Sequence, residues 1–317
     1  MKRIAMLAAM MMVAIAASAQ GTGQPGQQAP PAGGQTAPAT EAPPAPQAKR
    51  PPQTKTQPEY DAWRAADAGS RPTPEEQATA QKSAADAQQI AGAVAARTEK
   101  AADDFATKFP DSEVRILLYK VAMRNYQNAN NAEKTEAMGR KALTLDADDP
   151  ESLVTVSEVI VERTRDSDLD RDQRYDDAMK MAQKALTTVD TDVSVSPGTP
   201  QERIDAYKAG LRAQAYSTMG AIEYGKSNFP AAQANFQKAI DAFPSQPFPP
   251  DVLRLALSLD RQNKYDEALK VAVRAVELTQ ENTPLGTSAR RERDRLQQLT
   301  GATAAPATPP QAQPPKN

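Results

Sequence analysis

Residues 215–244 read AYSTMGAIEYGKSNFPAAQANFQKAIDAFP, and this stretch decides the fold. Strong helix formers fill both halves, and Ser-Asn-Phe-Pro at 227–230 separates them with a turn. Small residues on facing helices let two antiparallel helices approach closely, large residues fill the space beside them, and a proline stops the second helix. The stretch therefore predicts a helical hairpin. The residues that define its packing are Gly220, Ala232, Phe236, Ala239 and Pro244.

The hairpin pattern recurs along the chain. The equivalent alanines of the second helix are Ala142, Ala185, Ala239 and Ala275, with separations of 43, 54 and 36 residues. Against a period of about 34 residues, these separations leave insertions of about 9, 20 and 2 residues. A single hairpin leaves an apolar face open, so neighbouring copies must cover it. We predict copies at 116–149, 150–190, 202–246 and 249–279, the last marked by Ala256, Ala268 and Ala275.

The recurring pattern resembles the tetratricopeptide (TPR) repeat, whose first helix carries W-x2-L-G-x2-Y and whose second carries A-x3-F, then A and P. Residues 215–244 match nearly every diagnostic position, but Glu223 stands at the first-helix Tyr and Tyr224 follows one residue late. The resemblance implies an all-α fold, a right-handed superhelix of stacked antiparallel helix pairs. It also implies a non-catalytic role in binding proteins.

Further helical segments flank the four copies. Residues 58–115 are Ala-rich and end like a repeat, which predicts a degenerate first repeat. Residues 284–300 are highly charged and stop at Gly301, as is typical of a solvent-facing capping helix. The insertion of about 20 residues lies between Asp190 and Leu211, so we expect an irregular array that is bent at this junction.

The two ends of the chain are predicted to lie outside the folded body. Residues 1–19 combine a basic start, an apolar run and a small-x-small ending, and they resemble a bacterial secretory signal peptide cut after Ala19. The apolar run is too short to cross a bilayer, which takes about 20 residues. Residues 20–57 and 301–317 are rich in Pro and Ala, and we expect both to be disordered. We therefore expect a periplasmic or secreted protein without stable membrane insertion.

The composition excludes several classes of function. The chain contains no Cys and no His, which removes thiol nucleophiles, disulfides, the commonest general base and the commonest metal ligand. The net charge is -2 and the basic residues are interleaved with acids, which argues against nucleic acid as a partner. We expect no enzymatic activity, no cofactor and no bound metal.

One acidic stretch gives the metal hypothesis its best support. Asp166, Asp168 and Asp170 stand at the first, third and fifth positions of an EF-hand-like calcium loop. Arg171 occupies the position of the required Gly, and Asp177 that of the bidentate Glu. A solvated acidic insertion is the favoured interpretation, and a metal-binding protein or hydrolase is the least favoured function.

The remaining feature is the surface of the array. In TPR proteins the first helices of successive pairs line a concave groove that binds peptides, so the resemblance implies a scaffold for an unidentified protein or peptide partner in the cell envelope. When the copies are aligned with one another on the TPR pattern, the residues predicted to contact a partner in this groove are Lys120, Arg124, Glu158, Glu162, Ser217, Tyr224, Asp260 and Arg261.

A structural or assembly factor is the alternative. In that case the proline-rich arm at 20–57 tethers the body to another complex, and the array serves as a spacer.

Overall fold

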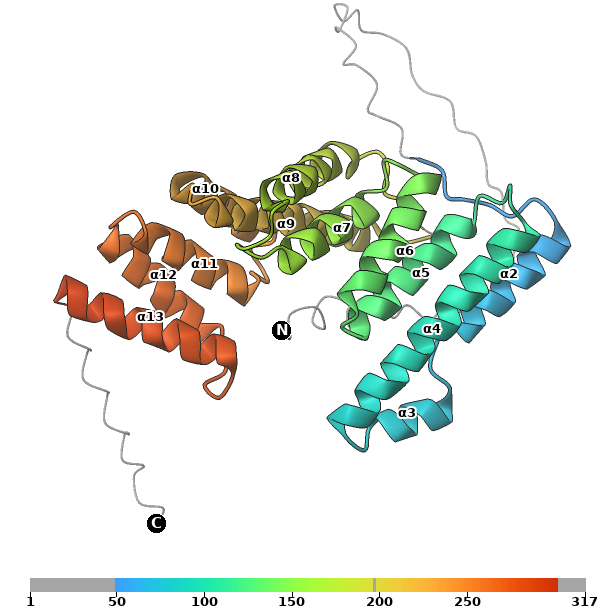
Figure 1. Ribbon diagram of the computed structural model, residues 1–317, viewed down its shortest axis with the longest axis horizontal. Coiled ribbons are helices and arrows are strands. Elements are labelled where there is room, and N and C mark those ends of the chain that lie inside the picture. Colours follow the sequence, from blue (N-terminus) through green and yellow to red (C-terminus); the bar gives the residue numbers. More distant parts are fainter. Residues whose placement is uncertain (1–48, 196–197, 302–317) are drawn as a thin grey trace, which may run out of the picture.

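The computed structural model describes residues 49–195 and 198–301, and all regular elements in these ranges are helices (Figure 1). The predicted signal peptide at 1–19, residues 20–48 of the proline-rich arm and the tail after Gly301 lie outside the described residues. The N-terminal segment forms α2 (Gln57–Gly69), α3 (Pro74–Ala80) and α4 (Ala84–Lys108).

Four helical hairpins follow, over residues 115–145, 150–188, 201–242 and 249–277. Each helix packs mainly against the helices next to it in sequence, and the final helix closes the stack. The prediction of an all-α stack of antiparallel helix pairs is confirmed, and the fold is a TPR-like solenoid. The pairs are α5 (Arg115–Asn128) with α6 (Ala132–Leu145), α7 (Pro150–Arg163) with α8 (Arg171–Thr188), α9 (Gln201–Gly225) with α10 (Phe229–Ala242), and α11 (Pro249–Asp260) with α12 (Tyr265–Glu277), followed by α13 (Pro284–Thr300).

Three of the four hairpin turns contain one residue with a positive φ. Asn130, Ser227 and Asn263 have φ values of 51°, 60° and 60°, in the left-handed region that few side chains adopt. All three stand at the same place in their repeats, just before the second helix. The turn between α7 and α8 is longer, spanning 164–170, and α8 has 18 residues against 13 or 14 for α6, α10 and α12. The insertion of about 9 residues is therefore shared between this turn and a longer second helix.

The seam inside a hairpin is filled by one small and one large residue. In the α9–α10 pair, a Cβ added to Gly220 would lie 2.7 Å from the Phe236 ring, so only Gly lets this ring lie against the first helix. Ala232, Phe236 and Ala239 are buried, and Pro244 follows the end of α10. In the α5–α6 pair the sizes are reversed, because Met123 on the first helix faces Gly139 on the second.

The insertion before α9 extends that helix toward its N-terminus. α9 begins at Gln201 and has 25 residues, against 12 to 14 for α5, α7 and α11. The loop after α8 packs Val189 and Val193 against Leu211 and Tyr207 of this extension. The extension is thus fixed to the body by an apolar cluster of its own.

The end of the proline-rich arm differs from the expected disorder. Residues 49–56, which we call the strap, run along the loops that join successive pairs. Lys49 contacts Asp146 (2.6 Å) and Asp192 (3.3 Å), and Arg50 makes two hydrogen bonds of 2.8 Å to Glu113. Carboxylates on these loops therefore hold the strap against the array.

None of the helices in the described ranges combines the length and the hydropathy of a membrane-spanning segment.

Candidate functional site

The first helices carry a continuous line of polar side chains from one pair to the next. We call this line the polar seam. Its members link α5 to α7, α7 to α9, α9 to α11, and α11 to α13, so it follows the face that the resemblance assigns to partner binding. It comprises Lys120, Arg124, Asp149, Glu151, Glu158, Glu162, Tyr207, Gln214, Ser217, Asp251, Arg254, Asp260 and Arg295.

The upstream end of the polar seam is a buried ion cluster. Lys120 is only 8% exposed, and its Nζ lies 2.6 Å from Asp149 Oδ1 and 3.0 Å from Glu151 Oε2. Burial alone would lower the pKa of Lys120, but the two carboxylates raise it above its usual range. Asp149 also accepts the Ser152 backbone N–H at 2.8 Å and so caps α7. This lysine is therefore engaged inside the fold.

Glu151 collects two further partners. Arg124 Nη2 donates to Glu151 Oε2 at 2.6 Å, and the Tyr207 hydroxyl donates to the same oxygen at 2.8 Å. Burial would raise the pKa of Glu151, but Arg124 and Lys120 hold it well below its usual range. Tyr207 belongs to the α9 extension, so the inserted residues close the seam at this end.

In the middle of the polar seam, the carboxyl group of Glu158 has less positive charge around it than that of Glu151. Half-buried Glu158 accepts a hydrogen bond from Gln214 of α9, and Glu162 stands one turn further along α7. Burial, and next the negative charge of Glu162, raise the pKa of Glu158 to about 7. Because a carboxyl normally ionises near pH 4, this group changes charge in an unusual pH range.

The next link in the polar seam joins α9 to α11. The Ser217 hydroxyl donates to Asp251 Oδ1 at 2.6 Å, and Arg254 Nη1 lies 3.6 Å from the same oxygen. Asp251 is 3% exposed, whereas 27% of the Arg254 side chain is exposed. We call Glu158, Glu162 and Arg254 the open part of the polar seam, because these side chains on α7 and α11 are at least partly exposed.

The other predicted contacts lie in different surroundings. Tyr224 packs its ring 5.3 Å from that of Phe229, at the turn into α10. The Arg261 guanidinium also lies over the Phe229 ring, 5.9 Å from its centre. Asp260 pairs with Arg295 of α13 and so links the last hairpin to the final helix. The structure therefore brings Lys120 and Arg124 together, places Glu158 beside Glu162, and keeps Tyr224 and Arg261 at a hairpin turn.

Sequence reasoning missed Asp149, Glu151, Tyr207 and Arg254. Asp149 and Glu151 flank Pro150 at the start of α7, where acidic residues are expected simply as caps. Tyr207 lies in the insertion, to which the repeat pattern assigns no position. Only the stacking of the pairs brings these residues to the polar seam.

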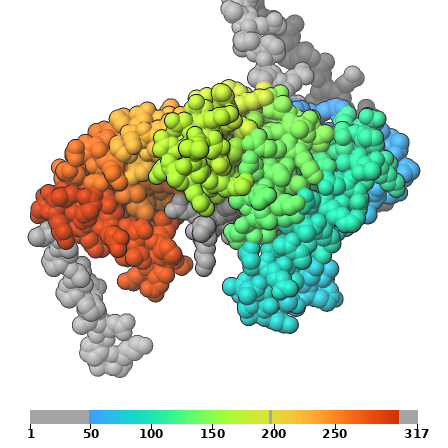
Figure 2. Space-filling model, viewed as in Figure 1, coloured from blue at the N-terminus to red at the C-terminus, as the bar shows by residue number. Residues whose placement is uncertain are grey.

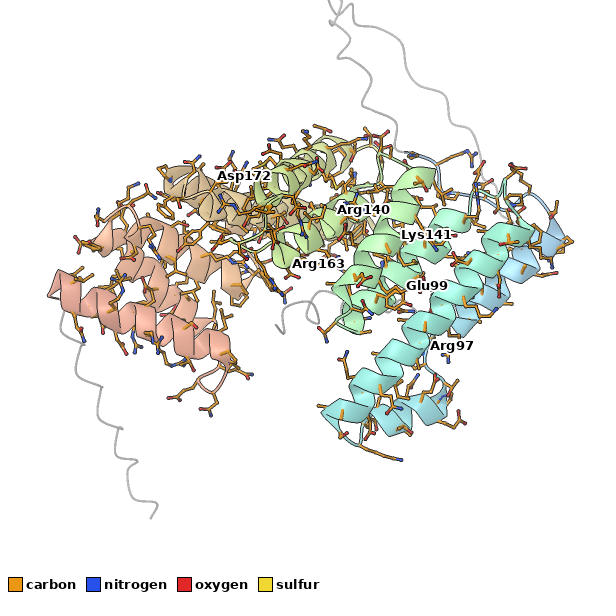
Figure 3. The ribbon with its side chains drawn as sticks, viewed as in Figure 1. Arg97, Glu99, Arg140, Lys141, Arg163 and Asp172 are labelled. Carbon is orange, nitrogen blue, oxygen red and sulfur yellow. The ribbon has the colours of Figure 1, made fainter. Side chains whose placement is uncertain are left out.

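A second set of charges, which includes Lys141 and Arg163, ties successive layers together (Figure 3). Lys141 of α6 reaches Asp103 of α4 at 2.7 Å, and Arg163 of α7 reaches Glu136 of α6 at 2.9 Å. Because these pairs are partly exposed to solvent, each contributes little to stability.

The overall outline is hollowed. Figure 2 shows a concave side between the end formed by α3 and α4 and the end formed by α11 to α13. An arched stack of this kind offers an extended surface to a partner.

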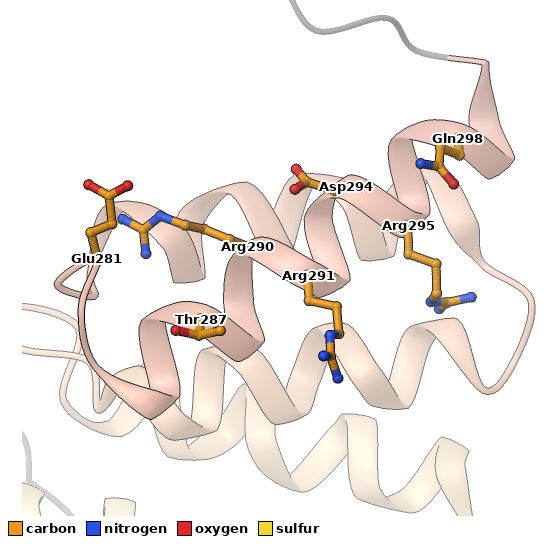
Figure 4. A pocket seen from close by; sticks show the side chains of 7 residues that line it. All are labelled: Glu281, Thr287, Arg290, Arg291, Asp294, Arg295 and Gln298. Atoms are coloured by element: carbon orange, nitrogen blue, oxygen red, sulfur yellow. The ribbon is translucent and has the colours of Figure 1, made fainter.

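A wide recess lies on the final helix (Figure 4). Its volume is about 640 Å³. Arg290 and Arg295 are already engaged there, by the Gly286 carbonyl and by the carboxylates of Asp260 and Glu292, while Arg291 is exposed. The recess is lined by Glu281, Thr287, Arg290, Arg291, Asp294, Arg295 and Gln298.

The acidic loop before α8 is organised by its own arginines. Arg171 lies 3.6 Å from Asp166, and Arg174 lies 3.6 Å from Asp168. Across the described parts of the chain, no three acidic side chains gather in a way that would hold a metal ion.

No family model and no curated protein matches the chain. Among solved structures, it is similar to PilW, a widely conserved type IV pilus biogenesis factor, with 17% identity, a TM-score of 0.44, and coverage of 78% of this chain and 96% of that one. It is similar to Acl4, an assembly chaperone of RpL4, with 12% identity, a TM-score of 0.32, and coverage of 68% and 95%. It is also similar to the APC/C hetero-tetramer Cut9-Hcn1, with 12% identity, a TM-score of 0.31, and coverage of 69% and 45%.

Proposed function

We propose that the chain is a non-catalytic scaffold of the bacterial cell envelope, and that a protein or peptide partner binds along the open part of the polar seam. The observation that carries the proposal is the contrast within the seam. Its upstream end is closed by Lys120, Arg124 and Tyr207, which already satisfy the carboxylates there. Downstream, half-buried Glu158 interacts electrostatically with Glu162 and Arg254, and a partner can contact these two side chains because both are at least partly exposed.

For a mutational test of partner binding, exposed residues of the polar seam are more suitable than its buried ion pairs. Reversing the charge of Lys120 would leave buried carboxylates unpaired and destabilise the fold, so the loss of a partner would be uninformative. Glu162 is exposed on α7, and Glu267 is an exposed glutamate on α12, which makes the two a matched pair.

The test compares Glu162→Lys with Glu267→Lys in the exported protein. A photo-crosslinking residue next to Glu162 first identifies the bound protein in cells. We expect Glu162→Lys to reduce recovery of that protein several-fold, and Glu267→Lys to leave it unchanged, with both variants equally helical by circular dichroism. Equal recovery from both variants would overturn binding at the polar seam.

Tethering by the proline-rich arm is the second candidate, and the docked strap favours it. Because the strap is held by Asp146, Asp192 and Glu113, the arm leaves the body at a fixed place beside the loop after α8. Deleting residues 20–48 keeps the strap. A tether then predicts loss of the protein's normal location in the envelope, whereas a scaffold that binds through the polar seam keeps its crosslinked partner.

A further inference from the structure

The loop between α7 and α8 presents an isolated apolar side chain to solvent. Leu169 is 107% exposed, while the next most exposed large apolar side chain, Leu299, is 52% exposed. The other three hairpin turns are tight, whereas this loop spans 164–170 and is lengthened by part of the insertion. The longer loop therefore places one leucine side chain fully in solvent.

The loop is held in shape by its own hydrogen bonds. The Arg165 backbone N–H donates to Asp168 Oδ2 at 2.9 Å, and the Asp168 N–H donates to the Arg165 carbonyl at 3.1 Å. The Arg171 N–H donates to the Asp168 carbonyl at 3.2 Å. A leucine on a preformed loop loses little conformational freedom when it binds. We call residues 166–172 the knob.

The knob carries negative charge around its leucine. Asp166 and Asp172 have side chains that are 90% and 75% exposed, and Asp170 is exposed between them. Arg171 lies beside the first two, so the acids outnumber the cations. A complementary surface must offer an apolar recess with cations at its edge.

A recess of this kind lies on the N-terminal part of the same chain. It has a volume of about 350 Å³ between the strap, α2 and the start of α5. The Tyr60 and Trp63 rings form part of its wall, and Tyr60 is 40% exposed. The recess is lined by Pro52, Gln53, Thr54, Tyr60, Trp63, Val114 and Leu117.

Three cations stand at the edge of this recess. Lys55, Arg64 and Arg115 each follow a lining residue directly in sequence. Lys55 and Arg115 contact backbone carbonyls, and Arg64 lies 6.0 Å from the centre of the Tyr60 ring. Lys55 interacts electrostatically with Glu59 and Glu113, whereas Arg64 and Arg115 form no ion pair with a carboxylate within the described ranges. The neighbouring acid Glu113 is already paired with Arg50.

We propose that the knob of one copy inserts Leu169 into the recess on the strap and α2 of a second copy. The contact must join two molecules, because Asp172, the last residue of the knob, lies far from α2 along the array (Figures 1 and 3). Different surfaces meet, so the association is head-to-tail, with a free knob at one end and a free recess at the other. It uses no residue of the polar seam and does not depend on the proposed partner.

Engineered cysteines test the contact directly, because the chain has no cysteine of its own. Ser167→Cys, which keeps Leu169, and Gln53→Cys are placed in separate copies, which are mixed and oxidised, and disulfide dimers are followed on non-reducing gels. The matched control replaces Ser167→Cys by Ser288→Cys, at an exposed serine on α13. We expect the knob pair to crosslink at least about tenfold faster than the control pair. Equal rates would overturn the proposal.

Sedimentation velocity supplies the second measurement. The wild-type protein should associate in a concentration-dependent way, and added salt should weaken the association because charges contribute to it. Leu169→Ser should raise the dissociation constant about tenfold, and Leu299→Ser should leave it unchanged. A wild-type protein that stays monomeric up to millimolar concentration at low salt would also overturn the proposal.

Discussion

Gly139 and Gly220 perform the same steric role on opposite helices of their pairs. Gly220 of α9 makes room for Phe236 of α10, whereas Gly139 of α6 makes room for Met123 of α5 and Val156 of α7. The family pattern places its small residue on the first helix, so the sequence identified Gly220 and overlooked Gly139. In both pairs the close contact between helices is made by a glycine against a large side chain, in keeping with a densely packed interior.

Gly139→Ala should therefore destabilise the protein. The added Cβ would lie 2.4 Å from Val156 Cγ2 and 3.1 Å from the Met123 sulfur. Overpacking of this kind typically costs about 1–3 kcal/mol in the free energy of unfolding, which urea denaturation measures. Gly92→Ala is the control, since no atom lies within 4 Å of its added Cβ, and it should leave stability equal or raise it by about 1 kcal/mol. A Gly139→Ala protein as stable as wild type would contradict the packing argument.

Glu158 should make stability depend on pH near neutrality. Its pKa in the folded protein is about 7, above its ordinary value, so the folded state holds a proton that the unfolded state has released. The free energy of unfolding should then fall as pH rises from about 5 to 8, by roughly 1–3 kcal/mol. The chain has no His to titrate in this range.

Urea denaturation at several pH values checks this prediction. Glu158→Gln should flatten the dependence, while Glu267→Gln, at an exposed site on α12, should leave it as in wild type. The direction of the pH dependence distinguishes Glu158 from Glu151. The lowered pKa of Glu151 contributes stability that is lost only when pH falls below about 4. A wild-type protein whose stability rises between pH 5 and 8 would refute the role given to Glu158.

At the scale of elements, the hairpins followed from local sequence. α5 to α12 form four hairpins, α13 follows the last of them, and Gly301 ends α13 with a φ of 69°. These features depend on neighbours within a few residues, namely helix propensity, turn chemistry and capping. The break between α3 and α4 was not predicted, although Thr73 and Ser83 supply separate N-caps there.

The polar seam depended on contacts that local sequence does not encode. Lys120 was expected to line an open groove, because its position in the first helix of the repeat is one that faces the groove in TPR proteins. Its burial comes from Asp149 and Glu151 at the start of the next pair, and from Tyr207 more than 80 residues away. The strap was missed for the same reason, since its composition favours disorder and only distant carboxylates hold it.

The strap should detach when its ion pairs are weakened. Lys49 is its outermost contact, bonded to Asp146 and Asp192 through Nζ and to the Thr191 carbonyl through its backbone N–H. Because these contacts are solvent-exposed, Lys49→Ala or high salt should speed hydrogen exchange of the strap amides and leave the helices protected. Lys100→Ala removes an exposed ion pair on α4 and is the control. Unchanged exchange in Lys49→Ala would show that the lysine does not hold the strap.

At the scale of the molecule, the core is divided rather than continuous. One large apolar cluster joins α4, α5 and α6, and another joins α10 to α13. Smaller clusters connect them through α7, α8 and α9. In a stack whose layers touch only their neighbours, stability is the sum of local terms and interface terms.

The two halves should therefore lose structure separately. Leu118 on α5 and Leu296 on α13 are both almost fully buried, one in each large cluster, so they form a matched pair. Truncating a buried leucine to alanine typically costs about 2–5 kcal/mol. In hydrogen exchange followed by mass spectrometry, Leu118→Ala should expose the amides of α4, α5 and α6 while α10 to α13 keep their protection. Leu296→Ala should give the reverse pattern. If either variant lowered protection equally along the whole array, the chain would unfold as one cooperative unit and the small central clusters would transmit the loss completely.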